Sequence, residues 1–176
     1  HVSGQARVLA DHHAMAMDVS SEAQVREGFE HARRAFGRLD VLVNNASVLV
    51  TKKRPSVKQM DLLHAVNARA TMICIAECHD ALQESAGAIV TMAPPVRMGR
   101  LEWIAAHPPY TISKYGMTMA TLGAATDRVR ANCIWPRRMI ATAATEMLER
   151  SGHAPGAFSR GRSPKYMAEA VCELAL

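Results

Sequence analysis

Apolar residues along this chain occur either in short, nearly continuous runs or at the three- and four-residue spacing of a helix. The runs predict strands, which we place at residues 13–19, in LDVLVNNAS, in GAIVTMA and in RVRANCIWP. LDVLV is apolar at almost every position, which is typical of a strand covered on both faces, as in a parallel sheet.

The stretches between these runs are amphipathic and predict helices. The first helix should begin after Ser21, which forms a capping-box pattern with Gln24, and should end at Gly37. Further helices are expected at about residues 56–84, from Tyr110 towards Thr126, at 141–150 and at 164–176. Strands that alternate with helices predict an α/β fold, with a doubly wound parallel sheet in a single domain over residues 1–176.

Composition narrows the classes of function. The chain has 176 residues, of which 49% are hydrophobic, so it is long enough to bury one core. Lys and Arg outnumber Asp and Glu by 21 to 16, but aromatic residues make up only 5%, which argues against a nucleic-acid-binding surface. No apolar run approaches the roughly 18 residues that span a membrane. We therefore expect neither nucleic acid nor membrane among its partners.

The cysteine and histidine residues indicate a reducing compartment rather than a metal site. The four cysteines include no Cys-x-x-Cys pair, which favours the cytoplasm or, in a eukaryote, an organelle such as a peroxisome or mitochondrion. Cys74 and Cys78 share a helix face, where we expect small buried side chains. His12 and His13 are adjacent, so they cannot share one face as metal ligands usually do, and we expect no metal.

Asp18 and three short segments lie at the ends of the predicted strands. The segments are NNAS at 44–47, TMAPP at 91–95 and WPRR at 135–138. Ligands of open parallel sheets bind outside the carboxyl ends of the strands, so a binding site is expected where these segments meet. Ordinary turn chemistry explains a pair such as Asn-Asn equally well.

Tyr110 and Lys114 stand four residues apart in YTISK, so a helix places both side chains on one face. An ammonium group close to a phenol lowers the pKa of the phenol, which suits general acid and base catalysis. A partly buried tyrosine beside a solvated lysine has the same spacing, so the pair gains meaning only from its surroundings.

Those surroundings resemble the short-chain dehydrogenase/reductase family. RLDVLVNNAS is similar to the family's strand ending in Asn-Asn-Ala-Gly, with Ser47 in place of the glycine. VNARAT is similar to the helix with the active-site Asn, and YTISK matches Tyr-x-x-x-Lys. The stretches from APPVRMG to YGMTMATLG and from CIWPRR to ATEML are similar to the hydroxysteroid dehydrogenase-like subgroup.

This resemblance implies a Rossmann-like fold, NAD or NADP as cofactor, and the interconversion of a carbonyl and a secondary alcohol. It implies that Tyr110 exchanges a proton with the substrate, that Lys114 lowers the pKa of Tyr110 and binds the nicotinamide ribose, and that Asn67 holds a water of the proton relay. The other cofactor-binding residues that it implies are Asp18, Asn44, Ala46, Pro136 and Thr142.

Two features depart from the family. Nothing before Asp18 supplies the family's first strand and Gly-rich turn, so we expect a fold truncated at the N-terminus, and also at the C-terminus before the last strand. Ala93 and Pro94 stand where the family has its catalytic Ser, and Thr91 is displaced by roughly 6 to 7 Å along a strand. The alternative is therefore a catalytically inert relative or fragment with weak or no cofactor binding.

The resemblance also bears on substrate and assembly. The connector before Tyr110 and the loop after Pro136 are rich in Met, Trp and Ile, which suggests a small apolar carbonyl or alcohol substrate. Family members commonly pair through their two long helices, so a homo-oligomer is expected.

Overall fold

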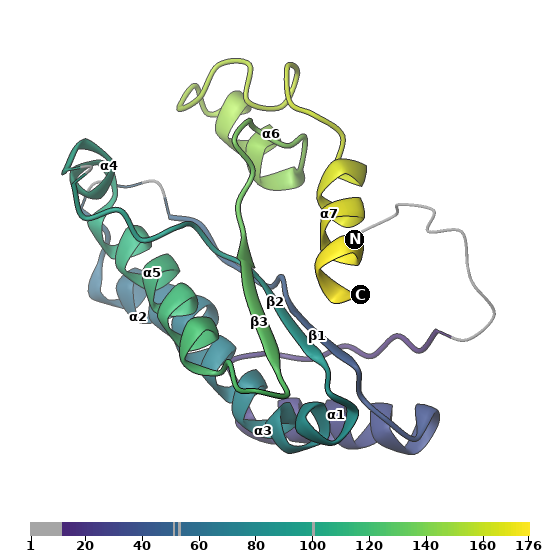
Figure 1. Ribbon diagram of the computed structural model, residues 1–176. Helices are drawn as coiled ribbons and strands as arrows, with labels where there is room; N and C mark the ends of the chain where they lie inside the picture. The colour runs from purple at the N-terminus through teal and green to yellow at the C-terminus, as the bar shows by residue number, and fades with distance from the viewer. Residues whose placement is uncertain (1–11, 51, 53, 100) are drawn as a thin grey trace.

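The computed structural model describes residues 12–50, 52, 54–99 and 101–176. Three parallel strands form a sheet in the order β1-β2-β3 (Figure 1). They are β1 (Val41–Asn44), β2 (Ala88–Met92) and β3 (Arg130–Ile134). The predicted α/β fold with a parallel sheet is confirmed, and these three strands lie where the apolar runs place them.

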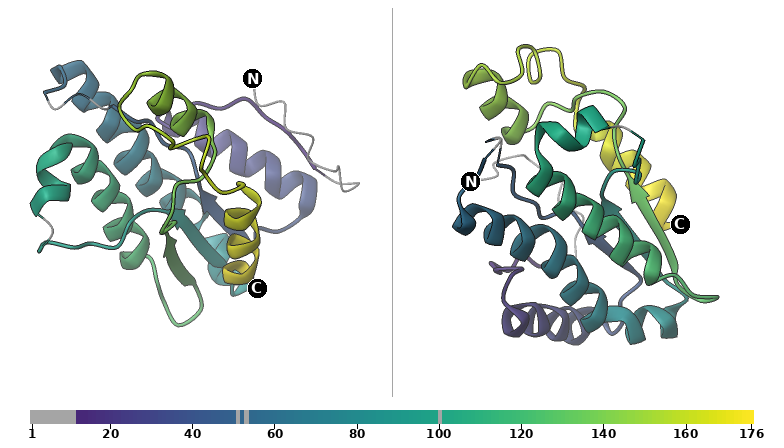
Figure 2. Two further views of the ribbon diagram at one scale, coloured as in Figure 1. Left: turned by 90° about the horizontal axis from the view of Figure 1, so that it is seen from above. Right: turned by 90° about the vertical axis from the view of Figure 1, so that its left-hand side faces the viewer.

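Helices cover one face of this sheet. The helix α1 (Glu22–Phe36) packs on α3 (Ala70–Ser85), and α3 packs on α5 (Pro108–Gly123). The right-hand view of Figure 2 shows the long helices side by side in front of the sheet. The core lies between these helices and the strands. Its buried residues are Val25, Leu42, Cys74, Ile75, Cys78, Leu82, Ile89, Ala124 and Val129.

The opposite face carries the last helix, α7 (Lys165–Ala175), which contacts β2 (Figure 1). At the edge strand β1, Val41 and Val43 remain 38% and 42% exposed on this face. The prediction that β1 is covered on both faces is therefore wrong, because α7 packs over the neighbouring strand and leaves one face of β1 open.

Residues before α1 do not form the predicted strand at 13–19. Residues 12–18 have no regular secondary structure, and among the described residues no strand pairs with them to exchange backbone hydrogen bonds. The helix α1 begins and ends as predicted, and Gly37 adopts the left-handed conformation with φ 76°. The predicted capping box is wrong: the Ser21 side chain makes no cap bond, and Gln24 Oε1 accepts from the Asp18 backbone N–H at 2.8 Å.

One long helix joins β1 to β2 and has three parts. They are α2 (Val57–Leu63), the π-helical turn η1 (His64–Arg69) and α3. The extent agrees with the prediction of about residues 56–84. The π turn was not predicted; such turns widen a helix by one residue and change which side chains face inward. Here it places Asn67 and Ala68 in the interior.

The remaining helices lie after β2 and β3. The sequence did not indicate α4 (Leu101–Ala106), which lies in the connector before α5. The helix α6 (Ala143–Arg150) and the helix α7 fall where they were predicted. The helix α5 ends at Gly123, before the predicted Thr126.

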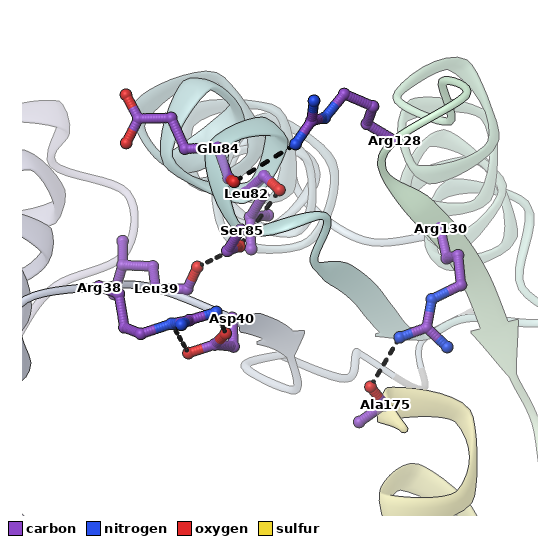
Figure 3. Close-up of polar contacts among 9 residues, drawn as sticks. All are labelled: Arg38, Leu39, Asp40, Leu82, Glu84, Ser85, Arg128, Arg130 and Ala175. Atoms are coloured by element: carbon purple, nitrogen blue, oxygen red, sulfur yellow. Dashed lines mark hydrogen bonds and ion pairs between the residues drawn. The ribbon is translucent and has the colours of Figure 1, made fainter.

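Side chain to backbone hydrogen bonds tie the elements together at the amino end of the sheet (Figure 3). Ser85 Oγ donates to the Leu39 carbonyl at 2.7 Å and so joins α3 to the segment before β1. Arg128 reaches the carbonyls at the end of α3. Arg130 at the start of β3 donates to the Ala175 carbonyl at 2.9 Å, which anchors the end of α7 to the sheet.

Candidate active site

Lys114 lies where the carboxyl ends of all three strands meet. Its Nζ donates to the carbonyl of Met92, the last residue of β2, at 2.6 Å. It donates at 3.4 Å to Oγ of Ser47, which follows β1, and lies 5.6 Å from the ring centroid of Trp135, which follows β3. The side chain is only 3% exposed. We refer to Lys114, Tyr110, Asn67, Ser113, Ser47 and Trp135 as the Lys114 site.

Burial changes the acid strength of Lys114. Loss of hydration disfavours the ammonium form and lowers the pKa of Lys114 to about 8, and the nearby Cys133 offsets this effect in part. An amine with a pKa of 8 is still mostly protonated at neutral pH. The site therefore holds a buried positive charge that is lost by deprotonation slightly above neutral pH.

Asn67 joins the helices and the loop around this charge. Its Nδ2 donates to Ser113 Oγ at 2.9 Å and to the Val48 carbonyl at 3.0 Å. Its Oδ1 accepts from the Val48 N–H at 2.8 Å and from Ser47 Oγ at 3.0 Å. The π turn directs this amide inward, where it is fully buried. Lys114, Ser47, Asn67 and Ser113 therefore form one connected chain of hydrogen bonds.

Tyr110 lies in the first turn of α5, one helical turn before Lys114. Its carbonyl accepts from Ser113 Oγ at 2.8 Å, which links it to the same chain of hydrogen bonds. Burial raises the pKa of the Tyr110 phenol. Burial therefore acts against the predicted lowering of the tyrosine pKa, and the effect of Lys114 on Tyr110 stays a prediction.

The position of the family's catalytic Ser carries no hydroxyl group. Ala93 and Pro94 follow β2 there and are both buried. Thr91 does not replace it, because its Oγ1 accepts from Thr121 Oγ1 at 2.7 Å and from Asn44 Nδ2 at 3.2 Å. These contacts hold the Thr91 hydroxyl inside the core, where it is 0% exposed.

The other residues expected to bind the cofactor fall into two groups. Asn44, Ala46 and Pro136 lie at the carboxyl ends of β1 and β3, on the side of the Lys114 site. Asp18 and Thr142 serve local turns: Asp18 Oδ1 accepts from the Ser20 N–H and hydroxyl, and the Thr142 hydroxyl caps α6. Hydrogen bonds from Ser20, with a smaller effect of the Arg69 charge, lower the pKa of Asp18.

Three residues of the Lys114 site were not predicted to have roles of their own. Ser113 lies inside YTISK, and Ser47 was noted only as a substitute for glycine. Trp135 was noted only as a member of residues 135–138, which follow a predicted strand. A signal for Ser113 is present in the sequence, since it is adjacent to Lys114 and three residues after Tyr110. The contacts of Ser47 and Trp135 depend on how the strands assemble.

The described residues contain neither a cluster of metal ligands nor a membrane-spanning helix. No group of three or more His, Cys, Asp or Glu side chains in this part of the chain is arranged to hold a metal ion. Across the same described ranges, each helix is too short or too polar to span a bilayer.

Comparison with known proteins agrees with this arrangement. Residues 2–174 match the family model described as enoyl-(acyl carrier protein) reductase, of the short-chain dehydrogenases/reductases. The mouse hydroxysteroid dehydrogenase-like protein 2 is 39% identical over 142 residues, covering 77% of this chain and 29% of the mouse protein. The Xenopus laevis protein of that name is 37% identical over 161 residues, covering 88% of this chain and 37% of that protein. The chain thus spans about a third of the length of these relatives.

Solved structures give the same result. A putative dehydrogenase from Xanthomonas campestris superimposes with a TM-score of 0.77 at 36% identity, covering 88% of this chain and 57% of that one. ElxO with NADP bound, at 24% identity, shares the fold with a TM-score of 0.75, over 91% of this chain and 69% of that one. The predicted Rossmann-like fold is confirmed, and the chain belongs to the short-chain dehydrogenase/reductase family.

Proposed function

We propose that this protein is an NAD(P)-dependent oxidoreductase that interconverts a carbonyl and a secondary alcohol, with Tyr110 as the general acid and base. The observation that supports this most is the Lys114 site itself. A buried lysine, a tyrosine one turn away and a fully buried asparagine are joined through Ser47 and Ser113 at the carboxyl ends of the strands. Ligands of open parallel sheets bind at that end.

The protonation states suit carbonyl reduction at neutral pH. Because burial raises the pKa of Tyr110, its hydroxyl keeps its proton and can donate it to a substrate oxygen. Lys114, with a pKa of about 8, is mostly cationic at pH 7 and favours the phenolate left by that transfer. Asn67 has all four of its hydrogen bonds within the protein, so its role in this scheme is to fix Ser47 and Ser113.

The nicotinamide end of a dinucleotide fits these residues. When bound, the cofactor supplies or accepts the hydride. Among the hydrogen bonds of Lys114 Nζ, the one to Ser47 is long at 3.4 Å, so this N–H can turn towards a ribose hydroxyl. Asn44, Ala46 and the Trp135–Pro136 segment would line the same end of the pocket. The proposal also keeps Asp18 and Thr142 as cofactor-binding residues. Asp18 would lie near the adenine and Thr142 near the nicotinamide carboxamide.

The second candidate is a catalytically inert relative with weak or no cofactor binding. The observation that favours it is the lack of a hydroxyl group at Ala93 and Pro94, with Thr91 held in the core. Loss of one preorganised donor to a substrate oxygen typically lowers the rate by about 10² to 10³. An enzyme with this site would therefore be slow even with its cofactor in place.

Cofactor binding separates the two candidates. We would titrate the full chain with NADH and with NADPH and follow nicotinamide fluorescence, using Lys114→Ala as the test variant. We expect saturable binding that weakens at least about tenfold in Lys114→Ala, since a charged hydrogen bond is lost. A folded chain that binds neither cofactor at millimolar concentration would leave the inert relative as the answer.

Turnover tests the tyrosine and the missing hydroxyl. We expect Tyr110→Phe to abolish reduction of apolar ketones while cofactor affinity is kept. Tyr115→Phe is the matched control, because the bonds of the Tyr115 hydroxyl within the described residues are to the backbone of Arg97. Ala93→Ser should raise the rate by about 10², since it restores a donor beside the substrate oxygen. Equal rates in the Tyr110 and Tyr115 variants would exclude Tyr110 as the acid.

We propose a small apolar carbonyl or alcohol as substrate. The connector before α5 carries exposed apolar side chains, among them Met98 at 68% and Leu101 at 71%. A screen of apolar against charged ketones tests this choice, and faster turnover of charged ketones would contradict it.

We also propose a homo-oligomer that pairs through α3 and α5. Ile112, Met119 and Leu122 on α5 and Met72 on α3 are between 45% and 67% exposed, although all are apolar. A groove of about 450 Å³ lies along the contact between the two helices. Light scattering on the wild type and on Met119→Glu tests this arrangement: a monomeric wild type would contradict it.

The state of the cysteines suggests that the protein resides in a reducing compartment, either the cytoplasm or an organelle. Cys74, Cys78, Cys133 and Cys172 are all free thiols. Fractionation of cells that express the tagged chain tests this location.

A further inference from the structure

A second pocket lies between the loop after β3 and the start of α7, apart from the residues of the Lys114 site. Its volume is about 510 Å³. Arginines Arg137, Arg138 and Arg162 line it together with Tyr166, and apolar side chains such as Met167 complete the wall. We call it the arginine pocket. Nothing in the proposed oxidoreductase chemistry uses these three guanidinium groups.

The walls of the arginine pocket are held by backbone contacts. The Arg162 N–H donates to the Met139 carbonyl at 2.9 Å, and the Ala141 N–H donates to the Arg162 carbonyl at 2.8 Å. The two segments can approach this closely because residue 161 is glycine: a Cβ there would lie 2.8 Å from the Ala141 nitrogen. The Arg162 guanidinium lies 5.3 Å from the Tyr166 ring centroid, which orients it further. Two segments distant in sequence therefore bring their arginines together.

The positive charge of the arginine pocket is not neutralised within the described part of the chain, where none of its three arginines forms an ion pair. Three acidic side chains of the neighbouring helices are engaged elsewhere: Glu146 pairs with Arg150, Glu169 pairs with Lys165, and Glu149 accepts from the backbone at Phe158 and Ser159. The first turn of α7 contains no acidic residue, so its positive dipole end is not offset there.

We propose that the arginine pocket binds the phosphate group of a small organic molecule. Guanidinium groups match phosphate oxygens with paired N–H donors, and three of them suit a group with two or more negative charges. A pocket of 510 Å³ with apolar walls is far larger than an inorganic ion and falls in the size range of sites for small organic ligands. The proposal does not depend on the proposed function.

Two sources supply this chemistry. Pro136 lines the arginine pocket and follows Trp135, whose ring lies beside Lys114, so the diphosphate of a dinucleotide at the Lys114 site is one source. A separate phosphorylated metabolite is the other. Both place the same group against the same arginines.

Calorimetric titration of the full chain with inorganic pyrophosphate tests the proposal. We expect saturable binding with one site per chain that weakens as salt is added. Arg138→Gln and Arg162→Gln should each weaken it at least about tenfold, since each removes charged hydrogen bonds. Arg34→Gln is the matched control, because it removes the same charge from an exposed position on α1 that is paired with Glu30. Thermal melting of each variant confirms folding, and Arg138→Gln, at an exposed residue, decides the case if Arg162→Gln is unstable.

A competition experiment distinguishes the sources. If NADPH displaces pyrophosphate, the arginine pocket takes the diphosphate of the dinucleotide; if both bind together, it takes a separate phosphorylated molecule. Lys114→Ala should leave pyrophosphate affinity unchanged, so a failure of the oxidoreductase proposal would not affect this result. Absence of saturable binding to the folded wild type, or equal affinity in the Arg138, Arg162 and Arg34 variants, would overturn the proposal.

Discussion

The two faces of the sheet differ in what covers them. On one face α3 and α5 pack on the strands and α1 packs on α3, and the inward-facing Leu42 and Ile89 are 8% and 0% exposed. On the other face α7 packs on β2, and the adjacent Val43 is 42% exposed although it has almost the same character. The strand sequence is equally apolar on both faces, so the difference arises from the helices alone.

The residues that stabilise the fold lie in a different part of the molecule from those that form the two candidate sites. The covered face holds the hydrophobic core, while the Lys114 site and the arginine pocket lie beyond the carboxyl ends of the strands, where loops meet. Substitutions in the covered face should therefore act on folding, and substitutions on the open face of β1 should act weakly. The predictions below test this division from the largest expected effect to the smallest.

Leu42 and Val43 are neighbours on β1 that face opposite sides of the sheet. We expect Leu42→Ala to lower the free energy of unfolding by about 3 kcal/mol, because it leaves a cavity under α3. Val43→Ala is the matched control and should cost below about 1 kcal/mol, since its side chain is already partly hydrated. Urea denaturation measures both. Equal costs would mean that the open face is as well packed as the covered one.

The buried charge of Lys114 gives folding a pH dependence. Its pKa is about 8 in the folded chain and near the ordinary 10.5 when unfolded, so between these values the folded state binds fewer protons. Relative to Lys114→Met, the stability of the wild type should therefore rise with pH, by about 2 kcal/mol from pH 8 to pH 10. The raised pKa values of Cys74 and Cys78 act in the opposite direction, equally in both proteins. Denaturation midpoints at pH 7, 8, 9 and 10 provide the test, and parallel curves for the two proteins would contradict it.

Asn67 and Asn45 contrast a buried amide with an exposed one. Asn67→Ala leaves Ser113 and the backbone of Val48 without their partners and should cost about 2 kcal/mol. Asn45→Ala should be nearly neutral, because this residue is exposed. Thermal unfolding of both variants measures the difference, and a neutral Asn67→Ala would show that water replaces the lost hydrogen bonds.

The reactivity of the cysteine thiols compares the two faces of the sheet, and this test requires no large change in stability. Burial raises the pKa of Cys74 to about 11 and that of Cys78 to about 12, whereas Cys172 on α7 is exposed. At pH 8 a thiol reagent should modify Cys172 first and reach Cys74 and Cys78 only when the chain unfolds. Cys172→Ser should remove the fast phase. Rapid modification of Cys74 in the native chain would show that the covered face opens.

Local signals were sufficient for most elements of the fold. Gly37 ends α1 because a left-handed residue without a side chain stops a helix wherever it occurs. The buried positions of Cys74 and Cys78 were predicted from helical spacing, and the structure confirms them. The predicted capping box does not form. The Gln24 side chain accepts from the backbone N–H of Asp18, which lies outside the four-residue pattern, and not from that of Ser21.

Within the site, spacing predicted neighbours along one helix but not contacts between elements. Tyr110 and Lys114 lie one turn apart as expected. Their acid strengths were not predictable, because the pKa of each depends on how much water the surrounding strands and loops exclude. The hydrogen bonds of Asn67 also required the π turn, which no local pattern indicated.

The sequence by itself determined the order of strands and helices, the family, and the residues placed at the strand ends, because periodicity and short motifs are properties of neighbouring residues. The tertiary structure decided which face of β1 is open, which charge is buried at Lys114, and that Arg162 meets Arg137 and Arg138. These depend on contacts between segments far apart in the chain. Burial and charge compensation are set there, and no local spacing encodes them.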